Sequence, residues 1–399
     1  MKRIAREEYL SKLIAFRDKQ VIKVITGIRR CGKSTLMEMY RDWLKENGVG
    51  EDQIVYLNFE DLDNYELRSA LALHRYVKPL LQSGRQTYVF FDEIQHVADF
   101  PDVVNSLNLN PNVDLYVTGS NAYMLSSEIS TLLSGRYIEV RMLPLSFREY
   151  ASAAGEGKTL QQTYNAYITR SSFPYALDLP DDRTVGDYLE SIFSTIILKD
   201  IIARKKISDV MMLESVVRFC ADNIGNMLST KRIADIMTAD GRKIDQKTVE
   251  RYLTALAETF FVYAAKRYDV KGRQLLKTLG KYYLVDVGLR RTLLGSRSFD
   301  AGRILENVVY LELLRCHKEV YVGKVNALEI DFVAIDGDGL AYYQVAATVR
   351  DEATLARELA PLQAVRDQHP KYVLTLDEDP AADYDGIKRM NALEWLMGR

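Results

Sequence analysis

The chain carries near its N-terminus the run Gly27-Ile28-Arg29-Arg30-Cys31-Gly32-Lys33-Ser34, which has the spacing of a phosphate-binding loop. In such a loop the glycines let backbone N–H groups surround phosphates, and the helix that follows adds a partial positive charge. Lys33 would reach the β- and γ-phosphates of ATP, and Ser34 would be a ligand of Mg²⁺. We predict that the nucleotide-binding residues are Gly27, Arg30, Cys31, Gly32, Lys33, Ser34 and Thr35.

Two adjacent carboxylates follow the apolar run 88–91. We expect Asp92 to hold Mg²⁺, commonly through a water ligand, and Glu93 to orient or deprotonate the attacking water. The plainer alternative is a solvated turn at the end of a strand. Beside a phosphate-binding loop, however, the adjacent glutamate predicts hydrolysis of ATP rather than nucleotide storage.

Three further polar residues follow or precede apolar runs in the same region. Ser120 and Asn121 come after the run 115–118 and could contact the γ-phosphate or the catalytic water, although a plain turn is an equally good interpretation. Arg136 precedes the run 137–140 and could neutralise transition-state charge, in cis or on a neighbouring subunit. A role in trans would require a head-to-tail homo-oligomer, whereas the bland alternative is a surface arginine.

These candidate residues belong to a region in which strand-like and helix-like patterns alternate in a regular way. Between residues 20 and 141, short apolar runs alternate with amphipathic helical patterns, which predicts a mostly parallel sheet with covered faces in an α/β P-loop domain, 1–143. Residues 144–208 indicate a helical lid or connector, broken at Phe173-Pro174. Residues 209–296 show helix, short helix, turn, helix and hairpin, the order of a winged helix-turn-helix. Residues 297–399 indicate a second α/β unit.

Charge is nearly balanced over the 399 residues, with a net charge of −2, so binding of DNA would need a local basic surface. Residues 266–303 provide one, with ten basic and three acidic side chains. We predict DNA contacts from the second helix of the winged segment and from its hairpin, through Lys247, Arg251, Lys271, Arg273 and Lys277. Winged helices also mediate protein contacts, and a charge run is usually a solvated face, so that alternative stays open.

Composition excludes several classes of protein. Hydrophobic residues make up 47% and charged residues 27% of the chain, which is the balance of a folded globular protein. Neither a secretory signal nor a run of about 18 apolar residues is present, so we expect a cytoplasmic protein without a membrane span. Three scattered cysteines support neither a disulfide framework nor a zinc site.

With these residues in view, the chain resembles a family of predicted bacterial and archaeal AAA+-type ATPases. The resemblance is carried by motifs in order along the chain, among them TGIRRCGKSTL, VFFDEIQ, TGSNAYML, KYYLVDVGLR and EIDFV. It implies a P-loop ATPase domain with Gly32, Lys33, Ser34 and Asp92 in the roles above. It also implies a winged helix and a C-terminal domain like the PD-(D/E)xK nucleases. Ser171-Ser172 depart from the family, which more often shows two glycines there.

A PD-(D/E)xK site needs a carboxylate on one strand and an acid-x-lysine on the next, often with a glutamate on the preceding helix. Glu306 and Asp331 fit the helix and the first strand, but Gln344 and Ala346 replace the second acid and the lysine. Magnesium is held mainly by anionic oxygen, so this loss predicts a vestigial site. Glu329 lies on the same side of its strand as Asp331 and could partly compensate.

The sequence therefore predicts a magnesium-dependent AAA+-type ATPase that acts on or around DNA as a motor, loader or clamp. Its nuclease-like domain would serve binding or assembly. The alternative is an ATP-operated switch whose winged helix and nuclease-like domain bind proteins. We expect a homo-oligomer, and the sequence does not identify protein partners.

Overall fold

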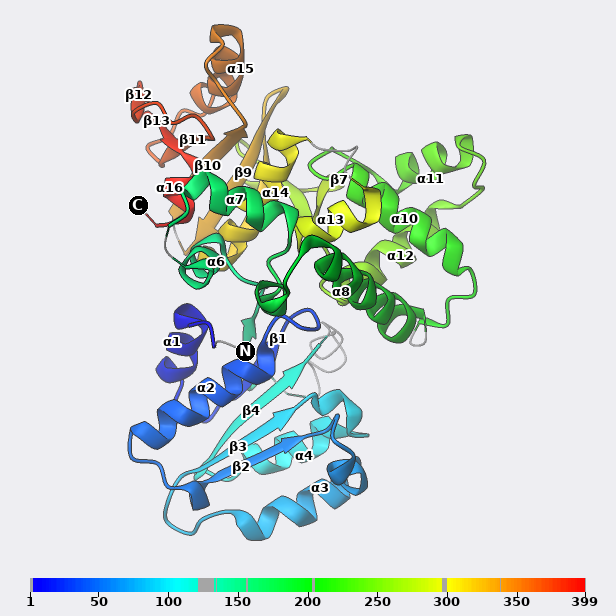
Figure 1. The fold of residues 1–399 in the computed structure, drawn as a ribbon, viewed down its shortest axis with the longest axis vertical. Helices are drawn as coiled ribbons and strands as arrows, with labels where there is room; N and C mark the ends of the chain where they lie inside the picture. Colours follow the sequence, from blue (N-terminus) through cyan, green and yellow to red (C-terminus); the bar gives the residue numbers. More distant parts are fainter. Residues whose placement is uncertain are drawn as a thin grey trace. The chain divides into compact units, whose positions relative to one another are not determined.

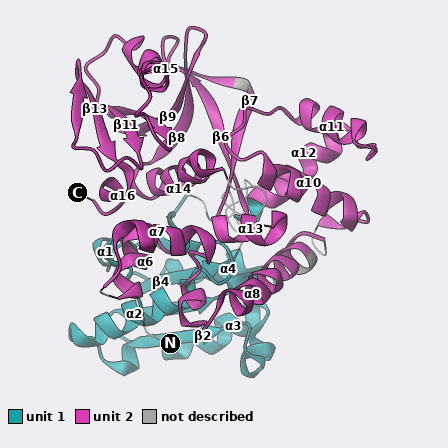
Figure 2. Ribbon diagram, turned by 45° about the horizontal axis from the view of Figure 1, so that its top comes forward, with its two compact units in different colours: residues 1–144, 258–260 teal, residues 145–257, 261–399 magenta. Residues whose placement is uncertain are grey.

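The computed structural model describes residues 3–120, 133, 135–155, 157–202, 205–295, 300–337 and 339–398, without the side chains of residues 198, 199, 277 and 278. Two compact units make up the chain (Figure 2). The first contains Met1–Pro144 and Glu258–Phe260, and the second contains Leu145–Ala257 and Phe261–Arg399. Across these described residues, no helix is both long and apolar enough to cross a membrane.

The first unit is built on a five-stranded sheet in the order β2-β3-β4-β1-β5, and every neighbouring pair of strands is parallel (Figure 1). Its strands are β1 (Ile22–Thr26), β2 (Ile54–Asn58), β3 (Thr87–Asp92), β4 (Val113–Gly119) and β5 (Tyr137–Arg141). The three central strands, β3, β4 and β1, are buried at every position, as continuous apolar runs predict for a sheet covered on both faces. The prediction of a parallel α/β sheet is confirmed.

Helices cover both faces of this sheet. On one face α2 packs its Tyr40 ring against Phe90 and Tyr116, at centroid distances of 6.2 and 5.0 Å. On the other face α3 and α4 join a core that contains Val89 and Phe91. The helices of the unit are α1 (Glu7–Ala15), α2 (Lys33–Glu46), α3 (Ala70–Val77) and α4 (Phe100–Asn108), with short 3-10 turns η1 (Glu51–Gln53), η2 (Leu62–Leu67), η3 (Lys78–Leu80) and η4 (Ile94–His96).

In the second unit, the starts of helices are marked by capping side chains and by proline. Ser229 caps the start of one helix, since its hydroxyl accepts a hydrogen bond from the Arg232 backbone N–H at 3.1 Å. Pro174 starts a 3-10 turn at the predicted break. At the departure from the family, the Ser172 backbone N–H and hydroxyl each donate to Asp286 at 2.6 Å. The elements are α6 (Phe147–Ala154), α7 (Leu160–Thr169), η6 (Pro174–Asp178), α8 (Asp182–Thr195), η7 (Ile196–Ile202), α10 (Val210–Asp222), α11 (Thr230–Ala239), α12 (Gln246–Glu258), α13 (Val287–Leu294), α14 (Ala301–Cys316), α15 (Glu352–Gln363) and α16 (Ala392–Leu396).

The second unit also holds an eight-stranded mixed sheet in the order β12-β13-β11-β10-β9-β8-β6-β7. Its strands are β6 (Val262–Asp269), β7 (Gln274–Leu284), β8 (Glu319–Val325), β9 (Leu328–Asp336), β10 (Gly339–Ala346), β11 (Lys371–Thr375), β12 (Ala382–Tyr384) and β13 (Ile387–Asn391). The β6–β7 hairpin, which we expected to be a separate wing, joins this sheet because β6 pairs in parallel with β8. The segments that we separated between residues 296 and 297 therefore share one sheet.

Candidate functional site

The phosphate-binding loop connects the end of β1 to the start of α2, as the sequence predicts. Gly27 has a φ of 150°, and a Cβ there would lie 2.2 Å from the Met142 carbonyl oxygen. Gly32 has a φ of 104°, and Arg30 is held in the left-handed region with a φ of 67°. Because side chains are disfavoured in such backbone, the loop needs its glycines to wrap around a ligand. This tight, N–H-rich turn before a helix fits the phosphates of a nucleotide.

Lys33 begins α2 and its ammonium lies inside the loop. Its Nζ donates to the carbonyl oxygens of Gly27 and Ile28, at 3.1 and 3.3 Å, and lies 3.6 Å from Glu93 Oε1. Only 4% of the side chain is exposed. These contacts place a desolvated positive charge where the loop would hold phosphates.

The remaining loop residues surround this lysine in different ways. Ser34 and Thr35 are partly exposed on the first turn of α2, which suits a magnesium ligand and a phosphate contact. Arg30 is exposed at the tip of the loop. Cys31 is buried, and burial raises the pKa of its thiol, so it packs in the loop as an uncharged side chain.

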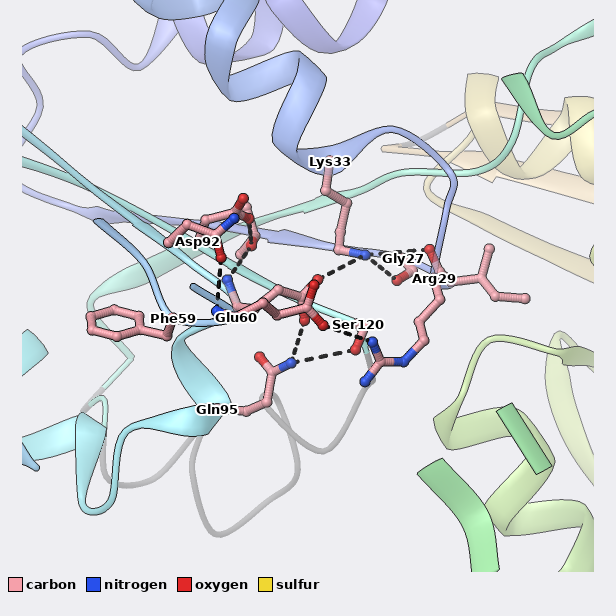
Figure 3. Close-up of polar contacts among 12 residues, drawn as sticks. Gly27, Arg29, Lys33, Phe59, Glu60, Asp92, Gln95 and Ser120 are labelled. Atoms are coloured by element: carbon pink, nitrogen blue, oxygen red, sulfur yellow. Dashed lines mark hydrogen bonds and ion pairs between the residues drawn. The ribbon is translucent and has the colours of Figure 1, made fainter. Parts of the chain in front are cut away.

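Asp92 ends β3 as a fully buried carboxylate fixed by both neighbouring strands (Figure 3). Its Oδ1 accepts from the Thr118 hydroxyl on β4 at 2.5 Å, and its Oδ2 accepts from the Tyr56 hydroxyl on β2 at 3.0 Å. An oxygen donor set of Asp92 and Ser34 suits Mg²⁺, which commonly binds through one or two protein oxygens and several waters. Tyr56 and Thr118 were not predicted as site residues, and their only sequence signal is that they are polar positions in apolar strands.

Glu93 follows with a left-handed backbone, φ 53°, a strained conformation of the kind that clusters at functional sites. Its backbone N–H donates to Thr118 Oγ1 at 2.8 Å, and its carboxylate accepts from the Gln95 amide. Burial opposes the charge of Glu93, but Lys33, the Gln95 amide and Arg29 together lower the pKa of its carboxyl below the ordinary value. Glu93 therefore stays ionised beside the loop.

Ser120 and Arg136, two of the three other predicted catalytic residues, differ in where they lie relative to the phosphate-binding loop. Ser120 is buried, and its hydroxyl lies 3.4 Å from the Gln95 amide nitrogen, next to the Glu93 carboxylate. Asn121 lies outside the described residues. Arg136 is exposed at the start of β5, and its carbonyl accepts from the Ile22 N–H at the opposite end of β1 from the loop. The five residues of β5, at about 3.3 Å each, separate Arg136 from the edge of the sheet that carries the phosphate-binding loop. Arg136 therefore cannot reach the nucleotide site of its own chain. A role in trans stays a prediction.

The predicted DNA contacts lie on the surface of the second unit. Lys247 and Arg251 are exposed on α12, and Lys271 and Arg273 are exposed where β6 turns into β7. The side chain of Lys277 lies outside the described residues. Two members of the basic segment, Lys281 and Arg290, are buried, so the local basic surface is smaller than the sequence indicates.

Glu306, Asp331 and Gln344 come together in the second unit, where they are joined by a lysine that was not predicted to belong to this site. Lys281 on β7 places its Nζ 2.7 Å from Glu306, 2.8 Å from Glu329 and 3.0 Å from Asp331. We call these four residues the Lys281 cluster. The Lys281 ammonium stands among the carboxylates although Ala346 replaces the expected lysine. No sequence signal links Lys281 to this site, because it lies 50 residues before Asp331 in another hairpin.

The Lys281 ammonium offsets part of the negative charge of the three carboxylates in the Lys281 cluster. Burial raises the pKa of Glu306 to about 7, while the three carboxylates raise the pKa of Lys281 well above its ordinary value against the effect of its burial. Gln344 accepts from the Asp331 N–H at 3.2 Å and donates to Glu358 at 2.8 Å. Within the described part of the chain, no group of three or more His, Cys, Asp or Glu side chains could hold a metal ion.

Comparison with known proteins gives matches over nearly the whole chain. Residues 19–151 match the family model of an AAA domain, and residues 161–300 match a domain of unknown function. An uncharacterized protein of Haemophilus influenzae is 36% identical over 398 residues, covering 99% of this chain and 98% of its own length. An uncharacterized protein of Methanocaldococcus jannaschii is 28% identical over 341 residues, which is 81% of this chain and 74% of that protein. A Walker-type ATPase of Pyrococcus abyssi has a similar fold, with a TM-score of 0.50 at 15% identity over 73% of this chain and 96% of that one.

Proposed function

Because the chain belongs to the family of the Haemophilus influenzae protein and carries an AAA domain, we propose that it hydrolyses ATP with Mg²⁺ and couples this cycle to DNA. The general class is a P-loop ATPase. The reaction, the metal and the DNA are the proposal. One observation carries the proposed ATP hydrolysis: Lys33, Asp92 and Glu93 converge at the edge of the sheet where the loop would place phosphates.

The residues divide the work of the site. Backbone N–H groups of the loop and the Lys33 ammonium would bind the phosphates, and Ser34 and Asp92 would hold Mg²⁺. The metal supplies positive charge against the phosphate oxygens. Thr118 and Tyr56 keep the Asp92 carboxylate in one orientation, since each donates to a different oxygen.

Glu93 acts on the attacking water. A carboxylate with a lowered pKa is a weak base at neutral pH, so its main work is to orient the water rather than to take its proton early. Gln95 holds one Glu93 oxygen and approaches Ser120, so these two side chains position the carboxylate. The arrangement favours hydrolysis because the ionised Glu93 carboxylate, buried beside the phosphate site, can orient the attacking water.

Two substitutions test the ATPase proposal. Lys33→Ala should abolish or greatly weaken ATP binding, because it removes the buried ammonium from the loop. Glu93→Gln should keep binding but stall hydrolysis. The matched control is Lys45→Ala, an exposed lysine of α2 that pairs with Glu51 and should behave as wild type. Binding by equilibrium titration and turnover by phosphate release separate the outcomes, and full turnover in Glu93→Gln would contradict the assigned role.

The DNA part of the proposal rests on the exposed basic residues of α12 and the β6–β7 turn. Lys and Arg contacts to phosphate release counterions, so affinity should fall as salt rises. Replacing Arg251, Lys271 and Arg273 together by Ala should weaken binding of all sequences alike and flatten the salt slope by up to about 3. Arg350→Ala, an exposed arginine that pairs with Asp379, is the control.

The alternative function is an ATP-operated switch that binds proteins. Turnover that ignores single-stranded, duplex and branched DNA, together with binding that ignores salt, would favour this alternative. DNA-stimulated turnover would favour the motor, loader or clamp.

A further inference from the structure

The loop brings a second positive side chain to the ATP site. Arg29 stands four residues before Lys33, and its Nη1 donates to Glu60 Oε1 at 3.0 Å. Figure 3 shows its guanidinium directed toward Glu60 and Ser120. Only 18% of the Arg29 side chain is exposed, and it acts electrostatically on Glu93. Arg29 therefore belongs to the site, although it was not among the predicted nucleotide-binding residues.

The ion pair between Glu60 and Arg29 is weak. Glu60 follows the end of β2, and its side chain is 52% exposed. Ion pairs with a solvent-exposed partner contribute little, since water and salt screen them. A phosphate group carries more charge and accepts two parallel hydrogen bonds from one guanidinium, so it competes well for Arg29.

A positive group at this position would favour hydrolysis. The water oxygen bonds to the γ-phosphorus while the bond to the β–γ bridging oxygen breaks, and ADP leaves with the electron pair of that bond. One water proton stays on the released phosphate and the other passes to solvent. Negative charge grows on the transferred group and the leaving oxygen, and an arginine there speeds the reaction strongly. Arg136 cannot supply this charge to its own site because it lies at the opposite edge of the sheet.

We propose that Arg29 stabilises the transferred phosphoryl group in cis, and that Glu60 holds its guanidinium until nucleotide binds. This inference rests on the proposed ATPase function. In this proposal the catalytic arginine of each active site comes from the same chain as the phosphate-binding loop. Turnover per chain should therefore not depend on protein concentration.

Arg29→Ala tests the arginine. It should keep ATP binding within several-fold of wild type and lower turnover by roughly 100-fold or more. Arg29→Lys should recover only part of the turnover, because an ammonium cannot form the paired hydrogen bonds of a guanidinium. Arg85→Ala is the matched control: Arg85 is exposed, pairs with Asp52 and precedes β3, at the edge away from the loop.

Glu60→Gln tests the acid independently of any effect of Arg29 variants on folding. Weakening the ion pair between Arg29 and residue 60 should lower the KM for ATP several-fold while kcat is kept. Turnover of Arg29→Ala within twofold of wild type, or an unchanged KM in Glu60→Gln, would overturn the inference alone. Loss of turnover in Arg136→Ala with Arg29→Ala active would also overturn it. A wild-type protein that binds ATP but never hydrolyses it would overturn the proposed hydrolysis and this inference together.

Discussion

Replacing Lys281 by Met would remove the one ammonium of the Lys281 cluster while keeping an unbranched side chain of similar length. Only 3% of the Lys281 side chain is exposed, and its Nζ lies 2.7, 2.8 and 3.0 Å from carboxylate oxygens of Glu306, Glu329 and Asp331. The variant leaves these carboxylates facing one another without a counter-charge. We expect a loss of stability confined to the second unit.

The magnitude follows from burial. Breaking a buried ion pair costs about 3–5 kcal/mol, because the remaining charge is desolvated and unpaired. Two features reduce the cost: Glu306 already has a pKa of about 7 and can take up a proton, and Glu329 is 39% exposed. We therefore expect about 3 kcal/mol, or roughly 6–12 °C in Tm for a unit of this size.

A second change should restore part of this loss. In Lys281→Met combined with Glu306→Gln, one ammonium and one carboxylate are removed together. The new amide oxygen can still accept from the Tyr283 hydroxyl, which bonds Glu306 at 2.6 Å. The double variant should therefore be more stable than Lys281→Met alone, by about half of the lost stability.

The chain provides its own reporter for this measurement. It has two tryptophans, Trp43 in the first unit and Trp395 in the second, where Trp395 packs 5.8 Å from the Tyr343 ring. In a Trp43→Phe background, thermal unfolding followed by fluorescence reports the second unit alone. Lys266→Met, an exposed lysine on β6, is the matched control. If Lys281→Met and Lys266→Met have the same Tm, the Lys281 cluster does not stabilise the second unit and the prediction is wrong.

Four shorter predictions test other parts of the structure. The pKa of Glu306 is about 7 in the folded chain against an ordinary value of 4.5, so between these pH values only the folded state keeps the proton and stability falls as pH rises, by on the order of 3 kcal/mol. Glu306→Gln should flatten that slope in Trp395 melting curves. Asp114→Asn should destabilise the first unit by about 3 kcal/mol, read from Trp43 fluorescence, because it strands the fully buried Lys23 ammonium. Gly27→Ala should keep the fold by circular dichroism but lose ATP binding in titration, because its Cβ would meet the Met142 carbonyl oxygen. Wild type and Asp331→Asn should both leave plasmid DNA uncut with Mg²⁺ or Mn²⁺ on agarose gels, and cutting by wild type alone would show that the site is not vestigial.

The parts of the site that are local in the chain could be predicted from the sequence. The loop at Gly27–Ser34 is a contiguous strand, turn and helix, so its glycines, its lysine and its helix start are visible in eight residues. Asp92 and Glu93 are visible for the same reason, because an apolar run ends at them. Periodicity also predicted the parallel sheet, since strands buried on both faces must be apolar throughout.

Contacts between residues that lie far apart in the chain could not be predicted from the sequence and became visible in the structure. Tyr56 and Thr118 reach Asp92 because β2 and β4 flank β3, and strand order is not written in any local pattern. Strand direction placed Arg136 at the wrong edge for a role in cis. The pairing of β6 with β8 brought Lys281 among carboxylates that follow it by 25 to 50 residues. Such contacts depend on strand pairing across long sequence separations, whereas a motif or a period reports only the conformation of neighbouring residues.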